Sequence, residues 1–224
     1  MKKVLVALFA LVLVIATAIP ASADDNLVTN GGFESPVLGN GTWTIYFPGS
    51  NSTGWSTGDQ GIEIQNHVAG TPNGGQQLCE LDPNHPTFIY QDLATEAGQE
   101  YTLSFYYSGR QGIGPDDNYL KVTWGGTEVF TTTEDGRGKG DTDWKSYSTT
   151  VKGTGTSTRL EFSGVGPTDP VPSYGMYIDD VSVTSFNVNN PTPELPAGAL
   201  LGLGLIGIGG LYFVNKRKEA VARA

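Results

Sequence analysis

Hydrophobic and polar residues alternate with period two along most of the middle of the chain. The clearest stretch is 100–109, where Tyr101, Leu103, Phe105 and Tyr107 occupy every second position. Side chains of a strand point alternately to the two faces of a sheet, so this pattern predicts a strand with one face in the core. No neighbouring stretch sustains a helical period, which favours an all-β sandwich or barrel.

Ten further strands are predicted from short runs of β-forming residues that are separated by turn residues. The pair Gly125-Gly126 predicts a tight hairpin between two of them. We expect the ten strands at 26–30, 42–47, 61–65, 76–81, 87–92, 119–124, 127–132, 144–151, 159–163 and 174–184.

The last of these strands has an unusual face. By simple alternation, Tyr177, Asp179, Val181 and Val183 share one side of the strand, and three of these four residues suit a core. A carboxylate that points inward must be protonated, paired or bound to a metal. We therefore expect Asp179 to reach a cation at the edge of the sandwich, whereas Asp180, of opposite parity, is expected to cap turn amides.

Both ends of the chain have the composition of targeting segments. Two lysines, an apolar run and an Ala-x-Ala site at 21–23 predict a secretory signal peptide. A second apolar run, followed by Lys216-Arg217-Lys218, is long enough for a transmembrane helix with a cytoplasmic C-terminus. We expect an exported, surface-anchored protein with five parts: signal peptide 1–23, β-sandwich domain 24–186, Pro/Asn spacer 187–194, transmembrane or sorting helix 195–214 and basic cytoplasmic tail 215–224.

The exported part is strongly acidic. It has seven basic and 21 acidic residues, a net charge of −14. Such a charge excludes nucleic acid as a partner, because it repels the phosphate backbone. Where carboxylates converge, it suits a hard cation such as Ca²⁺. The single cysteine, Cys79, excludes an internal disulfide and is expected to be buried.

Several motifs, in a fixed order, resemble those of galactose-binding-like jelly-roll domains. The run Asn30-Gly31-Gly32-Phe33-Glu34-Ser35-Pro36 resembles their opening, and Tyr177-Ile178-Asp179-Asp180-Val181 resembles their last strand. The intermediate motifs are Trp55, 61–64, 75–81, 89–93 and 98–105. The match covers nearly all of 26–184 and is similar both to plant cell-wall domains of unknown function and to modules that bind xylan and glucan. It implies an all-β jelly-roll sandwich.

The same resemblance implies a structural Ca²⁺ at the sandwich edge. Glu34 and Asp179 match the acidic positions of the family, and backbone carbonyls near Asn30 and Gly32 would complete an oxygen shell. Such a cation would tie the first strand to the last. The alternative is that these carboxylates accept hydrogen bonds from turn amides.

The C-terminal region has a second resemblance. Pro193-Glu194-Leu195-Pro196, the apolar run and the basic cluster are similar to PEP-CTERM-type sorting tails, which implies a sorting peptidase as a partner. The motif departs from Pro-Glu-Pro. Cleavage of the tail and its retention as a membrane helix therefore both remain open.

A carbohydrate ligand would require aromatic rings that pack on the C–H faces of sugars and polar groups that bond their hydroxyls. Trp124 and Trp144 are assigned to the core. The outer face of 100–109 and its surroundings supply the other candidates. The ligand-binding residues we expect are Trp43, Tyr46, Trp55, Tyr106, Arg110 and Tyr119, with Tyr119 lying across from Tyr106.

Catalytic motifs are lacking in the sequence. Neither a nucleophile elbow, a zinc-protease motif nor a phosphate-binding loop occurs, and His67 and His85 lie in turn-like contexts. We therefore expect a non-catalytic domain that recognises extracellular or envelope polysaccharide. Two alternatives are a matrix or surface-layer protein without a sugar ligand, and a glycoside hydrolase that uses Glu63 and Glu80 as its carboxylate pair.

Overall fold

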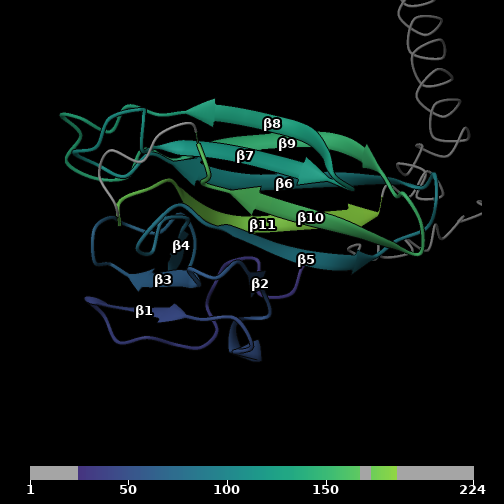
Figure 1. Ribbon diagram of the computed structural model, residues 1–224, viewed down its shortest axis with the longest axis horizontal. Helices are drawn as coiled ribbons and strands as arrows, with labels where there is room; N and C mark the ends of the chain where they lie inside the picture. Colours follow the sequence, from purple (N-terminus) through teal and green to yellow (C-terminus); the bar gives the residue numbers. More distant parts are fainter. Residues whose placement is uncertain (1–24, 167–172, 186–224) are drawn as a thin grey trace, which may run out of the picture. The chain divides into compact units, whose positions relative to one another are not determined.

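The computed structural model describes residues 25–166 and 173–185, which contain eleven strands and one 3-10 turn (Figure 1). The turn, η1, is Asn51–Thr53. The strands are β1 Thr42–Tyr46, β2 Ser56–Thr57, β3 Ile62–Asn66, β4 Leu78–Glu80, β5 Phe88–Ala94, β6 Glu100–Ser108, β7 Tyr119–Trp124, β8 Thr127–Thr133, β9 Lys145–Lys152, β10 Ser157–Ser163 and β11 Tyr177–Ser185.

These strands form two antiparallel sheets that pack face to face (Figure 1). The six-stranded sheet has the order β1-β3-β4-β11-β6-β9, and the five-stranded sheet has the order β2-β5-β10-β7-β8. The expected all-β sandwich is confirmed. No helix within the described residues is long and apolar enough to cross a bilayer. The predicted signal peptide, spacer, C-terminal helix and basic tail lie outside the described residues.

The core lies between the sheets and consists of the residues at alternate strand positions. Phe105 of β6 lies edge-on to Phe162 of β10, with ring centroids 5.0 Å apart. Trp55 stacks on Phe33 at 5.5 Å and meets Phe162 edge-on at 6.0 Å. These arrangements are the favoured ones for aromatic pairs. Trp124 and Cys79 are buried in this core, as expected.

The β7–β8 hairpin is confirmed at the predicted glycines. Trp124 pairs with Thr127, and Gly125 and Gly126 both have positive φ, 56° and 79°. Glycine adopts this conformation at little cost, and such turns match the twist of the two strands. The short strand β2 was not predicted, because two residues are too few to show an alternation.

A β-bulge in β11 contradicts the expected face of the last strand. The register of β11 against β6 shifts between Asp179 and Ser182, and Asp180 has a φ of 47°. The shift places Ile178 and Val181 on the core side, whereas Tyr177 and Asp179 point to the outer face of the six-stranded sheet. The extra residue of the bulge therefore separates the residues that simple alternation put together.

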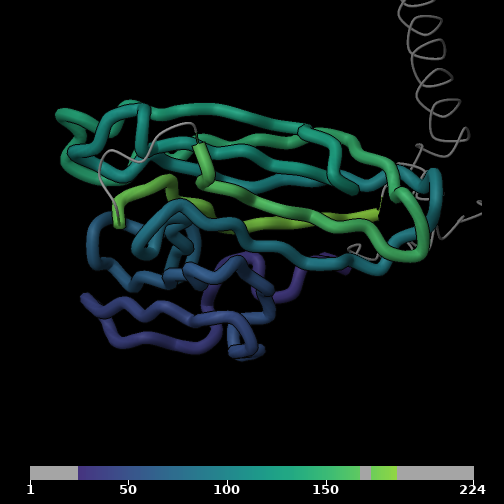
Figure 2. The backbone as a smooth tube through the Cα atoms, in the orientation of Figure 1, coloured from purple at the N-terminus to yellow at the C-terminus, as the bar shows by residue number. Residues whose placement is uncertain are grey.

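The first described segment joins β11 without forming the predicted strand at 26–30. The Leu27 N–H donates to the Val183 carbonyl at 2.8 Å, and the Val181 N–H donates to the Gly31 carbonyl at 2.9 Å. A Cβ on Gly31 would lie 2.0 Å from the Val181 carbonyl oxygen, so only glycine fits at this approach. Figure 2 follows the chain from this purple segment to the yellow-green β11. The two ends of the domain thus lie side by side, as the sequence suggested.

Candidate functional site

Five polar or aromatic side chains are buried on the outer face of the six-stranded sheet, away from the main core. We call Glu63, Gln65, Glu80, Tyr177 and Asp179 the polar layer; each is at most 6% exposed. Loop 67–77, which connects β3 to β4, covers them. The Tyr177 hydroxyl donates to the Ala69 carbonyl at 3.3 Å, so the loop lies directly on β11. A polar surface of the sheet is thereby removed from water.

Acidic side chains fix one half of loop 67–77. Asp179 Oδ2 accepts the backbone N–H groups of Asn73 at 2.9 Å and Gly74 at 3.2 Å. Asp180 Oδ2 accepts the side-chain amide of Asn73 at 2.6 Å. Glu34 Oε1 accepts the N–H groups of Gln76 at 2.7 Å and Gln77 at 2.9 Å. The carboxylates therefore satisfy amides that no strand pairs.

Contacts with segment 141–144 fix the other half of the loop. Asp141 accepts hydrogen bonds from the backbone N–H of Thr71 at 2.8 Å and from its hydroxyl at 2.7 Å. The Trp144 indole donates to the Thr71 carbonyl at 2.8 Å. Trp144 is half-buried against this loop and is not part of the core, which corrects its predicted assignment.

The residues predicted to hold Ca²⁺ lie at one edge but have other partners. The side chain of Asn30 bridges the backbone of Ser35 and Thr53, and its carbonyl accepts the Trp55 indole N–H at 3.1 Å. Asp179 accepts a third N–H, that of Asp180, at 2.7 Å on Oδ1. Asp179 thus accepts three backbone N–H groups and anchors the loop.

Glu34 and Asp180 are better placed for a cation than Asp179. A Cβ built on Gly32 would lie 3.5 Å from Asp180 Oδ1 and 3.9 Å from Glu34 Cγ, so the two acids flank this glycine. Glu34 Oε2 and Asp180 Oδ1 accept no hydrogen bond from any described residue. No group of three or more His, Cys, Asp or Glu side chains within the described residues converges as a metal site. Two carboxylate oxygens at this edge are therefore left for a ligand.

Two glutamates face each other directly inside the polar layer. Glu63 and Glu80 are partners across β3 and β4, and both side chains accept a hydrogen bond from the same amide nitrogen of Gln65. The Gln65 amide donates to Glu63 at 2.8 Å and to Glu80 at 2.5 Å, which leaves Gln65 Oε1 buried without a partner. Two buried carboxyl groups this close repel each other when both are ionised, so we expect the pair to keep one proton.

The pKa values of the layer follow from its burial. Burial raises the pKa of Glu80 well above its usual range; Arg110 opposes this rise and Glu63 adds to it. Burial likewise raises the pKa of Glu63, against the hydrogen bond of Gln65 and the charge of Arg110. Burial and the neighbouring Asp180 raise the pKa of Asp179 to about 7, although three backbone N–H bonds oppose the rise.

Arg110 closes the layer at its outer end. Its Nη1 donates to both oxygens of Glu80 at 2.7 Å and to the Ser173 carbonyl at 3.2 Å. The guanidinium carbon lies 4.0 Å from the centre of the Tyr174 ring, within cation–π distance. The sequence predicted that Arg110 contacts a ligand. In the structure Arg110 also pairs with the buried Glu80.

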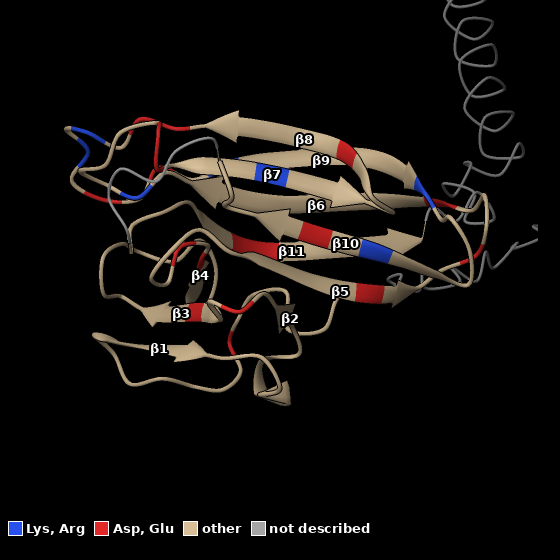
Figure 3. Ribbon diagram, viewed as in Figure 1, with Lys and Arg blue, Asp and Glu red and all other residues tan. Residues whose placement is uncertain are grey.

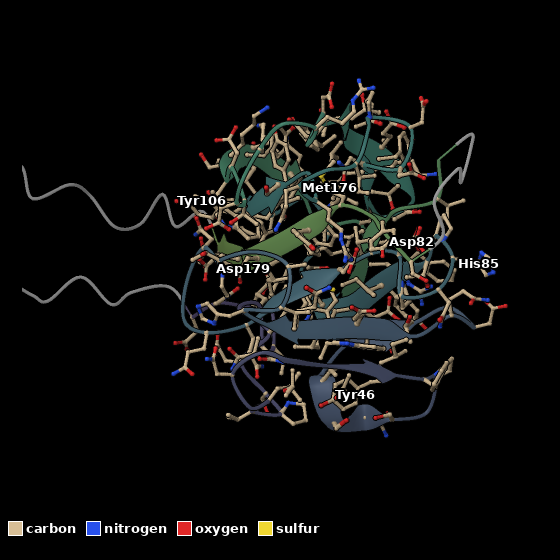
Figure 4. The ribbon with its side chains drawn as sticks, turned by 90° about the vertical axis from the view of Figure 1, so that its left-hand side faces the viewer. Tyr46, Asp82, His85, Tyr106, Met176 and Asp179 are labelled. Atoms are coloured by element: carbon tan, nitrogen blue, oxygen red, sulfur yellow. The ribbon has the colours of Figure 1, made fainter. Side chains whose placement is uncertain are left out.

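The structure distributes the predicted aromatic ligand residues over different surfaces. Trp43, which is 53% exposed, lies on the outer face of β1, opposite Gln65. Tyr46 lies on the core side of the same strand, far from Tyr106 (Figure 4). Trp55 is 4% exposed and belongs to the core, so it is not available to a ligand.

Tyr119 does not lie across from Tyr106. Tyr119 is in β7 of the five-stranded sheet, and Tyr106 is in β6 of the six-stranded sheet. Trp43 and Tyr106 share a sheet, but three strands separate β1 from β6, a span of about 19 Å. The six predicted residues therefore do not form a single site.

Tyr106 stands among hydroxyl side chains on the other half of the six-stranded sheet. Tyr106 is 38% exposed. The registers place Ser182, Ser104 and Ser148 in one row across β11, β6 and β9, and Thr184, Thr102 and Thr150 in the next row. We call this outer surface the hydroxyl face; it consists of Thr102, Ser104, Tyr106, Ser146, Ser148, Thr150, Ser182 and Thr184.

The hydroxyl face carries no charge between its ends. In β6 and β9 the charged residues are Glu100, Lys145 and Lys152, all at strand ends (Figure 3). In β11 the charged residues are Asp180, in the bulge, and Asp179, the register partner of Tyr106, which is buried. In so acidic a protein, an uncharged sheet face is a distinct surface. In the sequence, Ser146, Ser148 and Thr150 at every second position of one strand indicate a hydroxyl-rich face. Only the pairing of β11, β6 and β9 shows that such residues form continuous rows across three strands.

No family model matches the chain. A multifunctional-autoprocessing repeats-in-toxin protein of Vibrio cholerae is 30% identical over 161 residues, which span 71% of this chain and 3% of that protein. The chain thus corresponds to a small fraction of this relative's length.

Several similar solved structures are carbohydrate-binding modules. One of them, a family 16 module, is 15% identical over 71% of this chain and 99% of its own, with a TM-score of 0.43. The K1 adhesin domain of Lys-gingipain from Porphyromonas gingivalis is 14% identical over 64% of this chain and 98% of its own, with a TM-score of 0.46. At identities of 14–15% and TM-scores of 0.43 and 0.46, these likenesses carry no argument about function.

We expect stability to fall as the pH rises from about 5 to 8. The folded protein holds the proton of the Glu63–Glu80 pair more tightly than the unfolded chain, whose glutamates titrate near pH 4.3, as the raised pKa values require. The stabilisation is fully present below the unfolded pKa and is lost as the pH rises through the folded pKa, by at most about 1.4 kcal/mol per pH unit and proton.

Thermal unfolding of the wild type and Glu63→Gln between pH 5 and 8 measures this effect. The glutamine supplies its own N–H at every pH, so the variant should have a weaker pH dependence and a higher midpoint than the wild type at pH 8. Glu128→Gln on the exposed surface of β8 is the matched control. An equal pH dependence in the wild type and Glu63→Gln would contradict the shared proton.

Proposed function

We propose that the chain is an exported, non-catalytic carbohydrate-binding protein that contacts polysaccharide with the hydroxyl face. The observation that carries this proposal is the exposed ring of Tyr106 among in-register rows of serine and threonine. Sugars present C–H faces that pack on an aromatic ring and hydroxyls that exchange hydrogen bonds with serine and threonine. The face offers both kinds of contact on one rigid sheet.

Rigidity favours this role over a loop-based site. The hydroxyl face is built on β6, β9 and β11, which pair over most of their length. Side chains on paired strands lose little further freedom on binding, which lowers the entropic cost of recognition. The absence of charge within the face also avoids the cost of stripping water from ionised groups.

The burial of Glu63 and Glu80 supports a non-catalytic role over the glycoside hydrolase alternative. A hydrolase needs two carboxyl groups about 5 to 9.5 Å apart, with substrate or water between them. Glu63 and Glu80 are buried, both accept from the Gln65 amide, and Glu80 is paired with Arg110. Glu80 binds Arg110 directly, and Glu63 lies beside it. We therefore propose no catalytic role for either glutamate.

We further propose that the segments outside the described residues export and anchor the domain. The predicted signal peptide would direct it across the membrane, and the apolar run 195–214 would hold it at the cell surface. The intact mass of the protein from a membrane fraction tests this. A chain that begins near Asp24 and lacks or retains 195–214 fits export with or without tail processing, and a chain that retains residues 1–23 contradicts it.

We also propose that Ca²⁺ binds at the edge formed by Glu34 and Asp180. The two unpartnered carboxylate oxygens beside Gly32 support this assignment, and carboxylates are ligands that Ca²⁺ prefers. Bound there, the ion would link the N-terminal segment to β11 and loop 67–77. Asp179 is left out of this ligand set, because its oxygens already accept three N–H bonds.

Thermal unfolding with Ca²⁺ and with EDTA tests the cation. An ion that binds only the folded state, at 100 times its Kd, adds about 2.7 kcal/mol and raises the melting midpoint. The shift should disappear in Asp180→Asn and remain in the control Asp92→Asn, whose carboxylate lies on β5. A midpoint that is the same in Ca²⁺ and EDTA would contradict the site.

Substitution of Tyr106 tests the proposed carbohydrate face. Against a panel of immobilised polysaccharides, Tyr106→Ala should lower affinity about tenfold or more, because the loss of a central aromatic contact typically costs 2 kcal/mol or more. Phe47→Ala, an exposed aromatic beyond β1, should have no effect. Absence of binding to every polysaccharide in the wild type would favour the matrix or surface-layer role instead.

A further inference from the structure

The guanidinium of Arg110 is held in place from below by buried groups. Both oxygens of Glu80, which is fully buried, accept from Arg110 Nη1 at 2.7 Å, and the Ser173 carbonyl accepts from the same nitrogen at 3.2 Å. Glu80 is fixed in turn by the Gln65 amide at 2.5 Å and by the Gly175 N–H at 2.8 Å. The position of Arg110 is therefore set before any ligand arrives, which reduces the ordering cost of binding.

The opposite edge of the same guanidinium has no hydrogen-bond partner among the residues that the structure describes. No hydrogen bond among the described residues uses Arg110 Nε or Nη2. Neither nitrogen is among the buried unpartnered polar atoms, so both reach the surface, where the Arg110 side chain is 15% exposed. A fixed arginine with a free Nε–Nη2 edge is a donor pair whose geometry matches the two oxygens of a carboxylate.

An aromatic ring adjoins this donor edge. The Tyr174 ring lies 4.0 Å from the Arg110 guanidinium carbon and is 37% exposed. The guanidinium thus covers one face of the ring, and a ligand would contact the part of Tyr174 that stays exposed. A ligand that fits both groups carries a carboxylate beside a ring with C–H faces, which is the chemistry of a uronic acid.

We propose that Arg110 and Tyr174 form a subsite for the carboxylate of an acidic sugar in a polysaccharide. The proposal rests on the carbohydrate-binding function, because it takes the ligand to be a sugar, but it uses a different part of the surface from the hydroxyl face. The carboxylate accepts hydrogen bonds from Nε and Nη2, and the sugar ring packs on Tyr174. Glu80, Glu63 and Gln65 are positioning residues that act through Arg110.

The overall charge of the protein makes this contact selective. With a net charge of −14 for the exported part, the protein repels polyanions at long range. At an ionic strength of about 0.15 M this repulsion is screened beyond about 8 Å, whereas a close bidentate pair is not. Binding of an acidic polysaccharide therefore depends on the local fit at Arg110 and not on a diffuse basic patch.

The affinities of the full chain for polygalacturonate and for its methyl ester test the proposal at physiological salt. The two polymers differ in the carboxylate charge, so the wild type should bind the free acid about tenfold more tightly. Arg110→Lys should abolish this preference, because a lysine ammonium can still pair with Glu80 but has no second edge for a carboxylate. Its melting midpoint should stay close to that of the wild type, which shows that the fold is retained.

Matched controls distinguish the acidic-sugar subsite from the proposed carbohydrate-binding function. Arg137→Lys changes an exposed arginine that pairs with Asp135, and it should keep the preference for the free acid. Equal affinity for both polymers in the wild type, or an unchanged preference in Arg110→Lys, overturns the subsite and leaves the carbohydrate function standing. Binding of neither polymer, nor of any other polysaccharide, overturns both. Polyglutamate that binds as tightly as polygalacturonate overturns the assignment to a sugar.

Discussion

The bulge in β11 is the constraint on which the rest of this structure depends. One extra residue between Asp179 and Ser182 turns Tyr177 and Asp179 to the outer face while Val181 and Val183 enter the core. The same shift presents Val181 to the carbonyl of Gly31 and so joins the first segment to the last strand. Without it, Asp179 would lie in an apolar core, where a carboxylate is unstable.

The bulge divides the outer face of the six-stranded sheet into two regions with different physical chemistry. On the β3–β4 side, loop 67–77 covers ionisable groups whose burial costs free energy, and their hydrogen bonds fix both the loop and Arg110. On the β6–β9 side, serine, threonine and Tyr106 remain open to solvent. Burial of ionisable groups under loop 67–77 lowers stability, and their hydrogen bonds hold Arg110 in place. The hydroxyl face on β6, β9 and β11 stays exposed.

The sequence predicts much of the sandwich, because period-two alternation marks strands such as β6 and the glycine pair marks the β7–β8 hairpin. It does not predict contacts that depend on register or on long loops. The pairing of Glu63 with Glu80, the cover of loop 67–77 and the position of Trp144 are of this kind. The bulge had a signal that simple alternation overlooked: Ile178 is out of phase with Val181 and Val183, which only an extra residue between them reconciles.

We propose the outer face of the six-stranded sheet as the recognition surface. Hydrogen–deuterium exchange with and without a bound polysaccharide tests it most directly, because it reports every backbone amide in one measurement. We expect the backbone amides of β6, β9 and β11 to be protected from exchange. An acidic ligand should also protect the amides around Tyr174. Protection confined to β5, β7, β8 and β10 would contradict it, because those strands form the opposite sheet.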